Sequence, residues 1–116
     1  MKIKLIRKKL KIIFKKYKLN SAHSKICTEA IINAELVGAH SHGLSRVKMY
    51  CDRIAKKVIN PKPKIKIKKI SQSVSHIDAN NSIGFVAADL GIKTAIKHAQ
   101  KTGIGMVAIK GSGHYG

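Results

Sequence analysis

The stretch GFVAADLGIKTAIKHAQK, residues 84–101, is the strongest structural signal in this sequence of 116 residues. Its apolar side chains recur every three or four positions, which places them on one side of a helix. Gly103 follows and favours helix termination, and residues 106–109, MVAI, then form an apolar run typical of a buried strand. Helix and strand in succession predict a mixed α/β chain. The expected apolar side of the helix comprises Ala87, Leu90, Ile92, Ala95, Ile96 and Ala99.

Three more helices are predicted upstream. Residues 2–19 hold nine basic residues and no acid, with apolar residues at helical spacing. We expect an amphipathic helix docked on its own domain rather than a membrane-surface or targeting helix. Asn20 and Ser21 are candidate N-caps of a second helix that ends near Gly38, and a third helix covers residues 44–58. The expected buried faces are Ile6, Leu10, Ile13, Phe14 and Tyr17 in the first helix, Ile26, Cys27, Ala30, Ile31, Ala34 and Val37 in the second, and Leu44, Val47, Tyr50, Cys51, Ile54 and Val58 in the third.

Two strands are predicted before the long helix. Residues 64–70 alternate lysine and isoleucine, the period of a strand with one apolar and one solvent-facing side, which suits the edge of a sheet. A weaker alternation over residues 74–79 predicts a strand that ends in a turn or cap at Asn80 and Asn81. A sheet of at most three short strands needs further strands and helices to bury both of its faces. We therefore expect the beginning of a larger enzyme, with an amino-terminal helical region over residues 1–60 and the start of a truncated α/β cofactor and substrate domain over residues 61–116.

The composition excludes several classes of protein. Apolar residues make up 44% of the chain, enough for a folded core, and their longest runs are three or four residues, too short for a membrane-spanning helix. Lys and Arg number 24 against 5 acids, a net charge of +19. Because 21 of these are Lys, beside 18 Ile and only 4% aromatics, the charge favours AT-rich coding bias over a specific nucleic-acid partner. Cys27 and Cys51 indicate reduced, buried thiols in a cytosolic protein.

The carboxyl end carries the first candidate site. Gly111, Gly113 and Gly116 follow a predicted strand and match the spacing G-x-G-x-x-G, which lets the backbone approach a pyrophosphate at a helix N-terminus. The fingerprint lacks the helix and the acidic residue that normally come after it. The alternatives are a glycine-rich turn without a site, and a turn that presents His114 as an acid or base. The last is the interpretation we favour.

The second candidate site surrounds His42. His40 and His42 could bind a metal, but two ligands with no neighbouring thiolate or carboxylate are too few, so we expect no metal site. An imidazole with an ordinary pKa near 6.5 can instead exchange a proton at neutral pH. Arg46 is one of 3 arginines where lysine is the compositional default, which indicates bidentate binding of a carboxylate. Tyr50 lies one turn further on the same helical face. The alternatives are a solvated Arg46 and a core-edge Tyr50. No role is assigned to His23, His76 and His98, each of which we expect at the surface or satisfied by its backbone.

Together these residues resemble the malate/L-lactate dehydrogenase family of NAD(P)-dependent oxidoreductases, which lacks a Rossmann fold. Among its members the ureidoglycolate dehydrogenases look most similar, because their turn also reads Gly-His-x-Gly. Two positions depart from the family pattern: Phe85 stands where Gln is usual, and Glu35 where Asp is usual. The resemblance rests on residues 34–50, AELVGAHSHGLSRVKMY, on Ile59-Asn60-Pro61-x-Pro63, on Asp78-Ala79-Asn80-Asn81-x-x-Gly84, on residues 95–107 and on Gly113-His114-x-Gly116.

The resemblance implies an activity and a set of roles. It implies hydride transfer between NAD or NADP and a small 2-hydroxy or 2-oxo acid, with His114 or His42 as the catalytic acid/base. Arg46, Tyr50 and Ser41 would contact the substrate. Most cofactor-binding residues would lie beyond residue 116, and the full-length enzyme would be a cytoplasmic homodimer. Two alternatives stay open, namely a basic module that binds nucleic acid or anions, and an inactive gene remnant.

Overall fold

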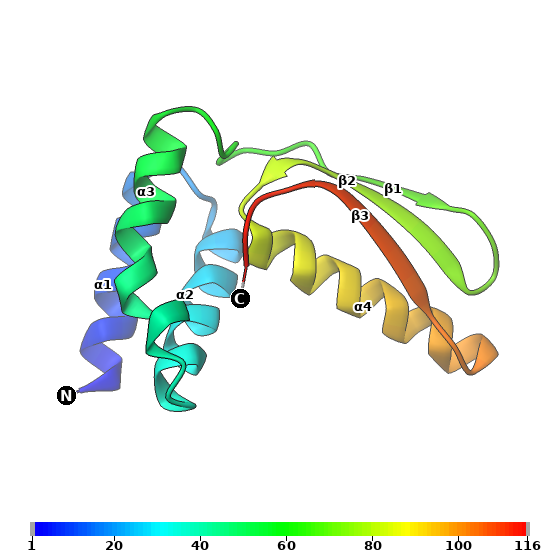
Figure 1. Ribbon diagram of the computed structural model, residues 1–116, viewed down its shortest axis with the longest axis horizontal. Coiled ribbons are helices and arrows are strands. Elements are labelled where there is room, and N and C mark those ends of the chain that lie inside the picture. Colours follow the sequence, from blue (N-terminus) through cyan, green and yellow to red (C-terminus); the bar gives the residue numbers. More distant parts are fainter. Residues whose placement is uncertain (1, 116) are drawn as a thin grey trace.

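The first two helices form an antiparallel hairpin. The structure, a computed structural model that describes residues 2–115, places α1 (Ile3–Lys16) against α2 (Ser21–Leu36) (Figure 1). Leu10 and Phe14 lie one turn apart on α1 and are buried, which confirms that the basic helix docks on its own domain. Asn20 is the N-cap of α2, because its side-chain oxygen accepts a hydrogen bond from His23 N at 2.8 Å.

The buried face of α2 differs from the predicted one. Cys27 and Ile31 are fully buried as expected, but Val37 follows the end of the helix and is 70% exposed. Ser24 and Thr28 are buried instead. The Ser24 hydroxyl donates to the Lys11 carbonyl oxygen at 3.2 Å, so a small polar side chain lets α1 approach closely. The helix is covered by α1 and by α4, and a single apolar stripe does not describe a helix with two neighbours.

The third predicted helix is shorter than expected and begins irregularly. Two 3₁₀ turns, η1 (His40–His42) and η2 (Leu44–Arg46), precede α3 (Val47–Ala55). Tyr50 and Ile54 are buried as predicted, whereas Val58 is 59% exposed. The helix ends before Val58 because Lys57 takes a left-handed conformation with φ +60°.

The sheet has mixed topology within the described residues. Its order is β1 (Lys66–Lys69), β2 (Val74–Ser82) and β3 (Met106–Ser112), with β1 antiparallel and β3 parallel to β2. The crossover between the parallel strands is α4 (Gly84–Thr102), which runs along one face of the sheet (Figure 1). Gly103 ends α4 with φ +87°, as predicted. The strand with the lysine–isoleucine alternation lies at an edge of this sheet, also as predicted.

Four details of the sheet and its helix contradict the predictions. Asn80 and Asn81 do not end β2: they take φ values of +51° and +57° inside it, where the register with β3 shifts. The isoleucine side of β1 is half-exposed. β3 is longer than expected and largely exposed rather than buried. The apolar side of α4 is only partly covered, since Ile92 and Ile96 are 59% and 47% exposed. The incomplete burial of β1, β3 and α4 has one common reason: residues 2–115 supply three strands and cover one sheet face with one helix.

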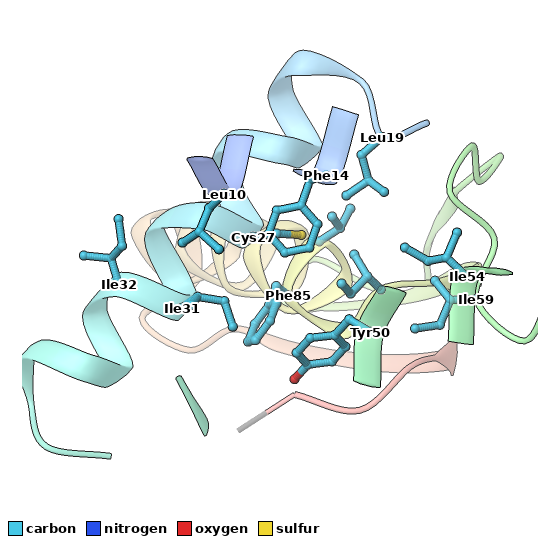
Figure 2. Packing of buried hydrophobic residues seen from close by; sticks show 12 residues of the cluster. Leu10, Phe14, Leu19, Cys27, Ile31, Ile32, Tyr50, Ile54, Ile59 and Phe85 are labelled. Atoms are coloured by element: carbon cyan, nitrogen blue, oxygen red, sulfur yellow. The ribbon is translucent and has the colours of Figure 1, made fainter. Parts of the chain in front are cut away.

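One hydrophobic core joins the first three helices to the residues between β2 and the start of α4 (Figure 2). It extends across residue 60, so the division into two regions at that point stays a prediction. A smaller cluster of Ile77, Ala79 and Ala87 lies between the sheet and α4. No helix among residues 2–115 is long and apolar enough to cross a membrane. The main core comprises Leu10, Phe14, Leu19, Cys27, Ile31, Ile32, Tyr50, Ile54, Ile59, Ile83, Phe85 and Val86.

Replacement of Phe14 tests this core. Phe14 is 0% exposed, so Phe14→Ala removes an aromatic ring from a closed site and should lower the free energy of unfolding by about 3–5 kcal/mol. Urea denaturation followed by circular dichroism measures the change. Ile12→Ala on the same helix is the matched control, because Ile12 is 57% exposed and its loss should cost about 0.5 kcal/mol or less. Equal effects of the two substitutions would contradict the packing of α1 described here.

Candidate active site

Two turns that are distant in the sequence bring two imidazoles together. His42 lies in η1, and His114 follows the end of β3. Their ring centroids are 6.1 Å apart and the ring planes differ by 19°. His114 is exposed and His42 is half-buried, so the two rings lie together at the surface, where a small molecule can reach both.

The position of His114 depends on close backbone contacts. Gly113 N donates to the Ser82 carbonyl oxygen at 2.9 Å, which continues the pairing of β3 with β2. The chain then passes over the first residue of α4, Gly84. A Cβ atom at Gly84 would lie 2.5 Å from the carbonyl oxygens of both Gly113 and His114, so no larger residue fits without moving the turn. The glycine in the middle of the sequence therefore determines where the histidine near the carboxyl end lies.

Tyr50 supports His114 from beneath. Its side chain is 1% exposed and packs edge-on against Phe85, with ring centroids 5.2 Å apart (Figure 2). Its hydroxyl lies 3.4 Å from His114 Nδ1, a long hydrogen bond. Burial raises the pKa of the Tyr50 hydroxyl, which therefore stays protonated at neutral pH. When the hydroxyl donates to Nδ1, the imidazole carries its proton on Nε2, on the opposite side of the ring.

Arg46 and Ser41 shape the turn that carries His42. Arg46 Nε donates to the Ser41 carbonyl oxygen at 2.7 Å, and Nη1 lies 3.8 Å from Met49 Sδ. The Ser41 hydroxyl is 3.0 Å from His42 Nδ1. The guanidinium thus keeps donors on its Nη atoms while Nε fixes the backbone of the turn. Within residues 2–115, Nη2 makes no hydrogen bond.

The predicted site residues are therefore neighbours, although their roles stay predictions. His114 contacts both His42 and Tyr50, and Ser41 and Arg46 belong to the same turn as His42. Tyr50 is a core residue and a site residue at once, so the two interpretations of it are compatible. Arg46 does not contact either site imidazole directly.

Glu35, to which the sequence alone assigned no role, holds this turn. Its Oε1 accepts a hydrogen bond from Leu44 N at 2.7 Å, and its Oε2 lies 2.6 Å from His40 Nδ1. His40 thereby turns toward Glu35 and away from His42, and residues 2–115 contain no cluster of three or more metal-ligating side chains. The sequence contains one indication of this role. Acids number only 5 in the chain, and one of them, Glu35, lies five positions before His40.

The structure also bears on the phosphate-binding loop, an alternative that we do not favour, and on the prediction for His98. The glycine-rich end forms no phosphate-binding loop over residues 111–115, because Gly111 and Ser112 still belong to β3 and the amide of Gly113 is already bonded to Ser82. Residues 111–113 therefore do not form the phosphate-binding turn of a dinucleotide fingerprint. His98 is buried and is satisfied by the Ser75 hydroxyl, 2.7 Å from its Nε2, rather than by backbone.

The comparison with known proteins decides the family. A profile described as malate/L-lactate dehydrogenase matches residues 1–116. The chain belongs to this family. The mixed fold class and the resemblance stated from the sequence are thereby confirmed.

Individual members of the family match this chain over most of its length. Malate dehydrogenase of Pyrococcus abyssi is 42% identical over 93 residues, which cover 80% of this chain and 26% of the relative. Ureidoglycolate dehydrogenase (NAD(+)) of Escherichia coli K12 is 36% identical over 98 residues, 84% of this chain and 28% of the relative. The structure of sulfolactate dehydrogenase from Methanocaldococcus jannaschii superposes with a TM-score of 0.96 at 33% identity, covering 100% of this chain and 34% of that one. The chain thus spans between 26% and 34% of the length of these family members.

The close approach at Gly84 gives a first test of the site. Gly84→Ala should push the 113–115 turn away from α4 and separate His114 from Tyr50, with loss of the nuclear Overhauser contacts between their rings. Gly103→Ala, at the other end of α4, is the matched control: it strains a left-handed residue in open space and should cost about 1 kcal/mol of stability while those contacts persist. Unchanged ring contacts in Gly84→Ala would show that the turn is not placed by this glycine.

The lowered pKa values of three carboxyl groups predict that the fold is less stable in acid. The pKa of Glu29 is lowered first by its hydrogen bond with Arg7, that of Glu35 first by its hydrogen bond with His40, and that of Asp78 first by the Asn80 amide. A carboxyl group whose pKa is lower in the folded state stabilises the fold above its unfolded pKa, and this contribution is lost as pH falls through the folded pKa. The free energy of unfolding should therefore decrease between about pH 5 and pH 3. Urea titrations across that range measure it, and a stability that rises on acidification would be inconsistent with these pairings.

Proposed function

We propose that this chain carries the substrate-binding and proton-transfer part of an NAD(P)-dependent oxidoreductase acting on a small 2-hydroxy or 2-oxo acid. The observation that supports this most is the pair of imidazoles, His42 and His114, 6.1 Å apart with Arg46 on the same turn as one of them. The names of relatives agree in type, since they include malate dehydrogenase, ureidoglycolate dehydrogenase (NAD(+)) and (2R)-3-sulfolactate dehydrogenase (NADP(+)). The cofactor is accordingly NAD or NADP.

Proton transfer is the step that these side chains suit. A bound nicotinamide cofactor supplies or accepts the hydride at the carbon that bears the hydroxyl or oxo group. In the reducing direction the substrate oxygen gains negative charge, and an imidazolium at His114 or His42 donates its proton to that oxygen; in the oxidising direction the neutral imidazole takes the proton back. General acid–base help of this kind accelerates a reaction roughly 10²–10⁴-fold.

Arg46 is suited to hold the substrate carboxylate. Its Nε is already bonded to Ser41 O, so the guanidinium is fixed in orientation while its Nη atoms can form charge-assisted bonds with an anion. Fixing the carboxylate at one end orients the oxo or hydroxyl group at the other toward the imidazoles. The protonated hydroxyl of Tyr50 and the hydroxyl of Ser41 are further donors beside the rings.

The proposal extends to the cofactor contacts, the cellular compartment and the oligomeric state of the enzyme. Because residues 111–113 do not form a phosphate-binding turn, we propose that most cofactor contacts come from the part of the family fold that this chain does not span. We place the enzyme in the cytoplasm, which the two free, buried cysteines support. The homodimer implied by the resemblance stays a prediction.

Titration of the purified chain with oxamate, a stable 2-oxo acid analogue, tests the proposal. Nuclear magnetic resonance should show the ring signals of His42 and His114 and the Nε signal of Arg46 shifting together, with one dissociation constant. Arg46→Lys replaces a bidentate fork with a point charge and should weaken oxamate binding about tenfold or more.

Arg53→Lys is the matched control, because Arg53 is an exposed arginine on α3 and its replacement should leave binding unchanged. Shifts scattered over many lysines, weakened equally in both variants and abolished by moderate salt, would identify a general anion-binding module instead. A chain without a cooperative thermal transition would identify an inactive remnant.

A further inference from the structure

The geometry points to Glu35 as a positioning residue that clamps the turn carrying His42. This inference rests on the proposed function for its meaning, since the turn matters because His42 and Arg46 act on a substrate. The clamp itself is a feature of contacts and can be tested without any substrate. Glu35 lies in the last turn of α2, outside the set of residues that face the proposed substrate.

One carboxylate holds both sides of the turn. Oε2 of Glu35 lies 2.6 Å from His40 Nδ1, just before Ser41 and His42, and Oε1 accepts the amide of Leu44 at 2.7 Å, just after Gly43. The three residues between these contacts are therefore tethered at each end to the same rigid helix. A hydrogen bond from a backbone amide to an ionised carboxylate is also among the stronger kinds.

Gly43 lets the carboxylate reach this position. It is buried, and a Cβ atom there would lie 2.6 Å from the carboxylate carbon of Glu35. Any larger residue would have to displace either the turn or the glutamate. The glycine after His42 thus leaves the space that the Glu35 carboxylate occupies.

Hydrogen bonds within the turn transmit the clamp to the site. The Ser45 hydroxyl donates to the carbonyl oxygen of His40 at 2.8 Å, and Arg46 Nε donates to the carbonyl oxygen of Ser41 at 2.7 Å. The segment from His40 to Arg46 is thereby cross-linked internally and attached to α2 by Glu35. Loss of the carboxylate would free the turn as a unit and move His42 relative to His114.

The surroundings leave His40 as the titratable partner of Glu35 among the described residues. α1 contributes Ile3 and Ile6 near the glutamate, and α2 contributes Ile32 and Leu36, all of them apolar. The hydrogen bond from His40, and then that from the Leu44 amide, lower the pKa of the Glu35 carboxyl. The clamp is therefore closed at neutral pH and opens when acid protonates the carboxylate.

Hydrogen exchange of the Leu44 amide measures the clamp directly. In Glu35→Ala this amide loses its acceptor and should exchange roughly tenfold faster or more. In Glu35→Gln the side chain keeps an oxygen for Leu44 N but carries no charge, so protection should be partly restored and should no longer collapse as pH falls below about 4. Glu29→Ala is the matched control, a second α2 glutamate in an exposed pair with Arg7, and should leave Leu44 unchanged.

Two further measurements keep the inference falsifiable. Gly43→Ala, with Glu35 intact, should accelerate Leu44 exchange as Glu35→Ala does, so the test survives if one variant fails to fold. Oxamate should bind Glu35→Ala more weakly than the parent, with Glu29→Ala unaffected. Leu44 exchange that is the same in the parent, Glu35→Ala and Gly43→Ala would overturn the clamp. If the parent itself does not bind oxamate at Arg46, the proposed function fails while the exchange data still decide the clamp.

Discussion

The packing of the Tyr50 ring in the main core is the interaction on which the candidate site depends. The ring belongs to the main core, where it meets Phe85, and its hydroxyl is the one part that reaches the surface site, 3.4 Å from His114 Nδ1. Because an interior is close-packed, a ring held on its sides by core residues has little freedom. Hydrophobic packing thus fixes the Tyr50 hydroxyl, and through this hydroxyl it orients His114. Phe85, one of the two positions that depart from the family pattern, places a second aromatic ring beside Tyr50.

The few acidic side chains of this basic protein all have a partner in the fold. The chain has 5 acids, and four of them form ion pairs: Glu29 with Arg7, Asp52 with Lys48, Asp78 with Lys110 and Asp89 with Lys93. The fifth, Glu35, has Oε2 2.6 Å from His40 Nδ1. Most of these pairs are exposed and contribute little stability individually. Asp78 and Glu35 each also accept a backbone amide, that of Asn80 two positions away for Asp78 and that of Leu44 nine positions away for Glu35. Glu35 therefore fixes the conformation of a longer segment.

Two glycines explain how the site can be assembled from separate turns. Gly84 admits the backbone of the carboxyl-terminal turn against the start of α4, and Gly43 admits the Glu35 carboxylate against the turn of His42. In each case the missing side chain is what permits the contact. The sheet meanwhile remains half-covered within residues 2–115, as the exposed isoleucines of β1 and α4 show.

The sequence by itself determined the local elements and the composition of the site. The N-cap at Asn20, the docking of the amphipathic first helix, the extent of α4 and its end at Gly103 follow from short-range hydrogen bonding and a 3.6-residue period, which a local stretch specifies. The motif residues around His42 and His114 were likewise readable. Only the tertiary structure decided which faces are buried, that Val37, Val58 and Ile92 are exposed, and that Asn80 and Asn81 form a register shift inside a strand. It alone brought the two imidazoles together and assigned Glu35 to the turn, because those contacts join residues far apart in the chain, and their partners are chosen by the packing of the whole molecule.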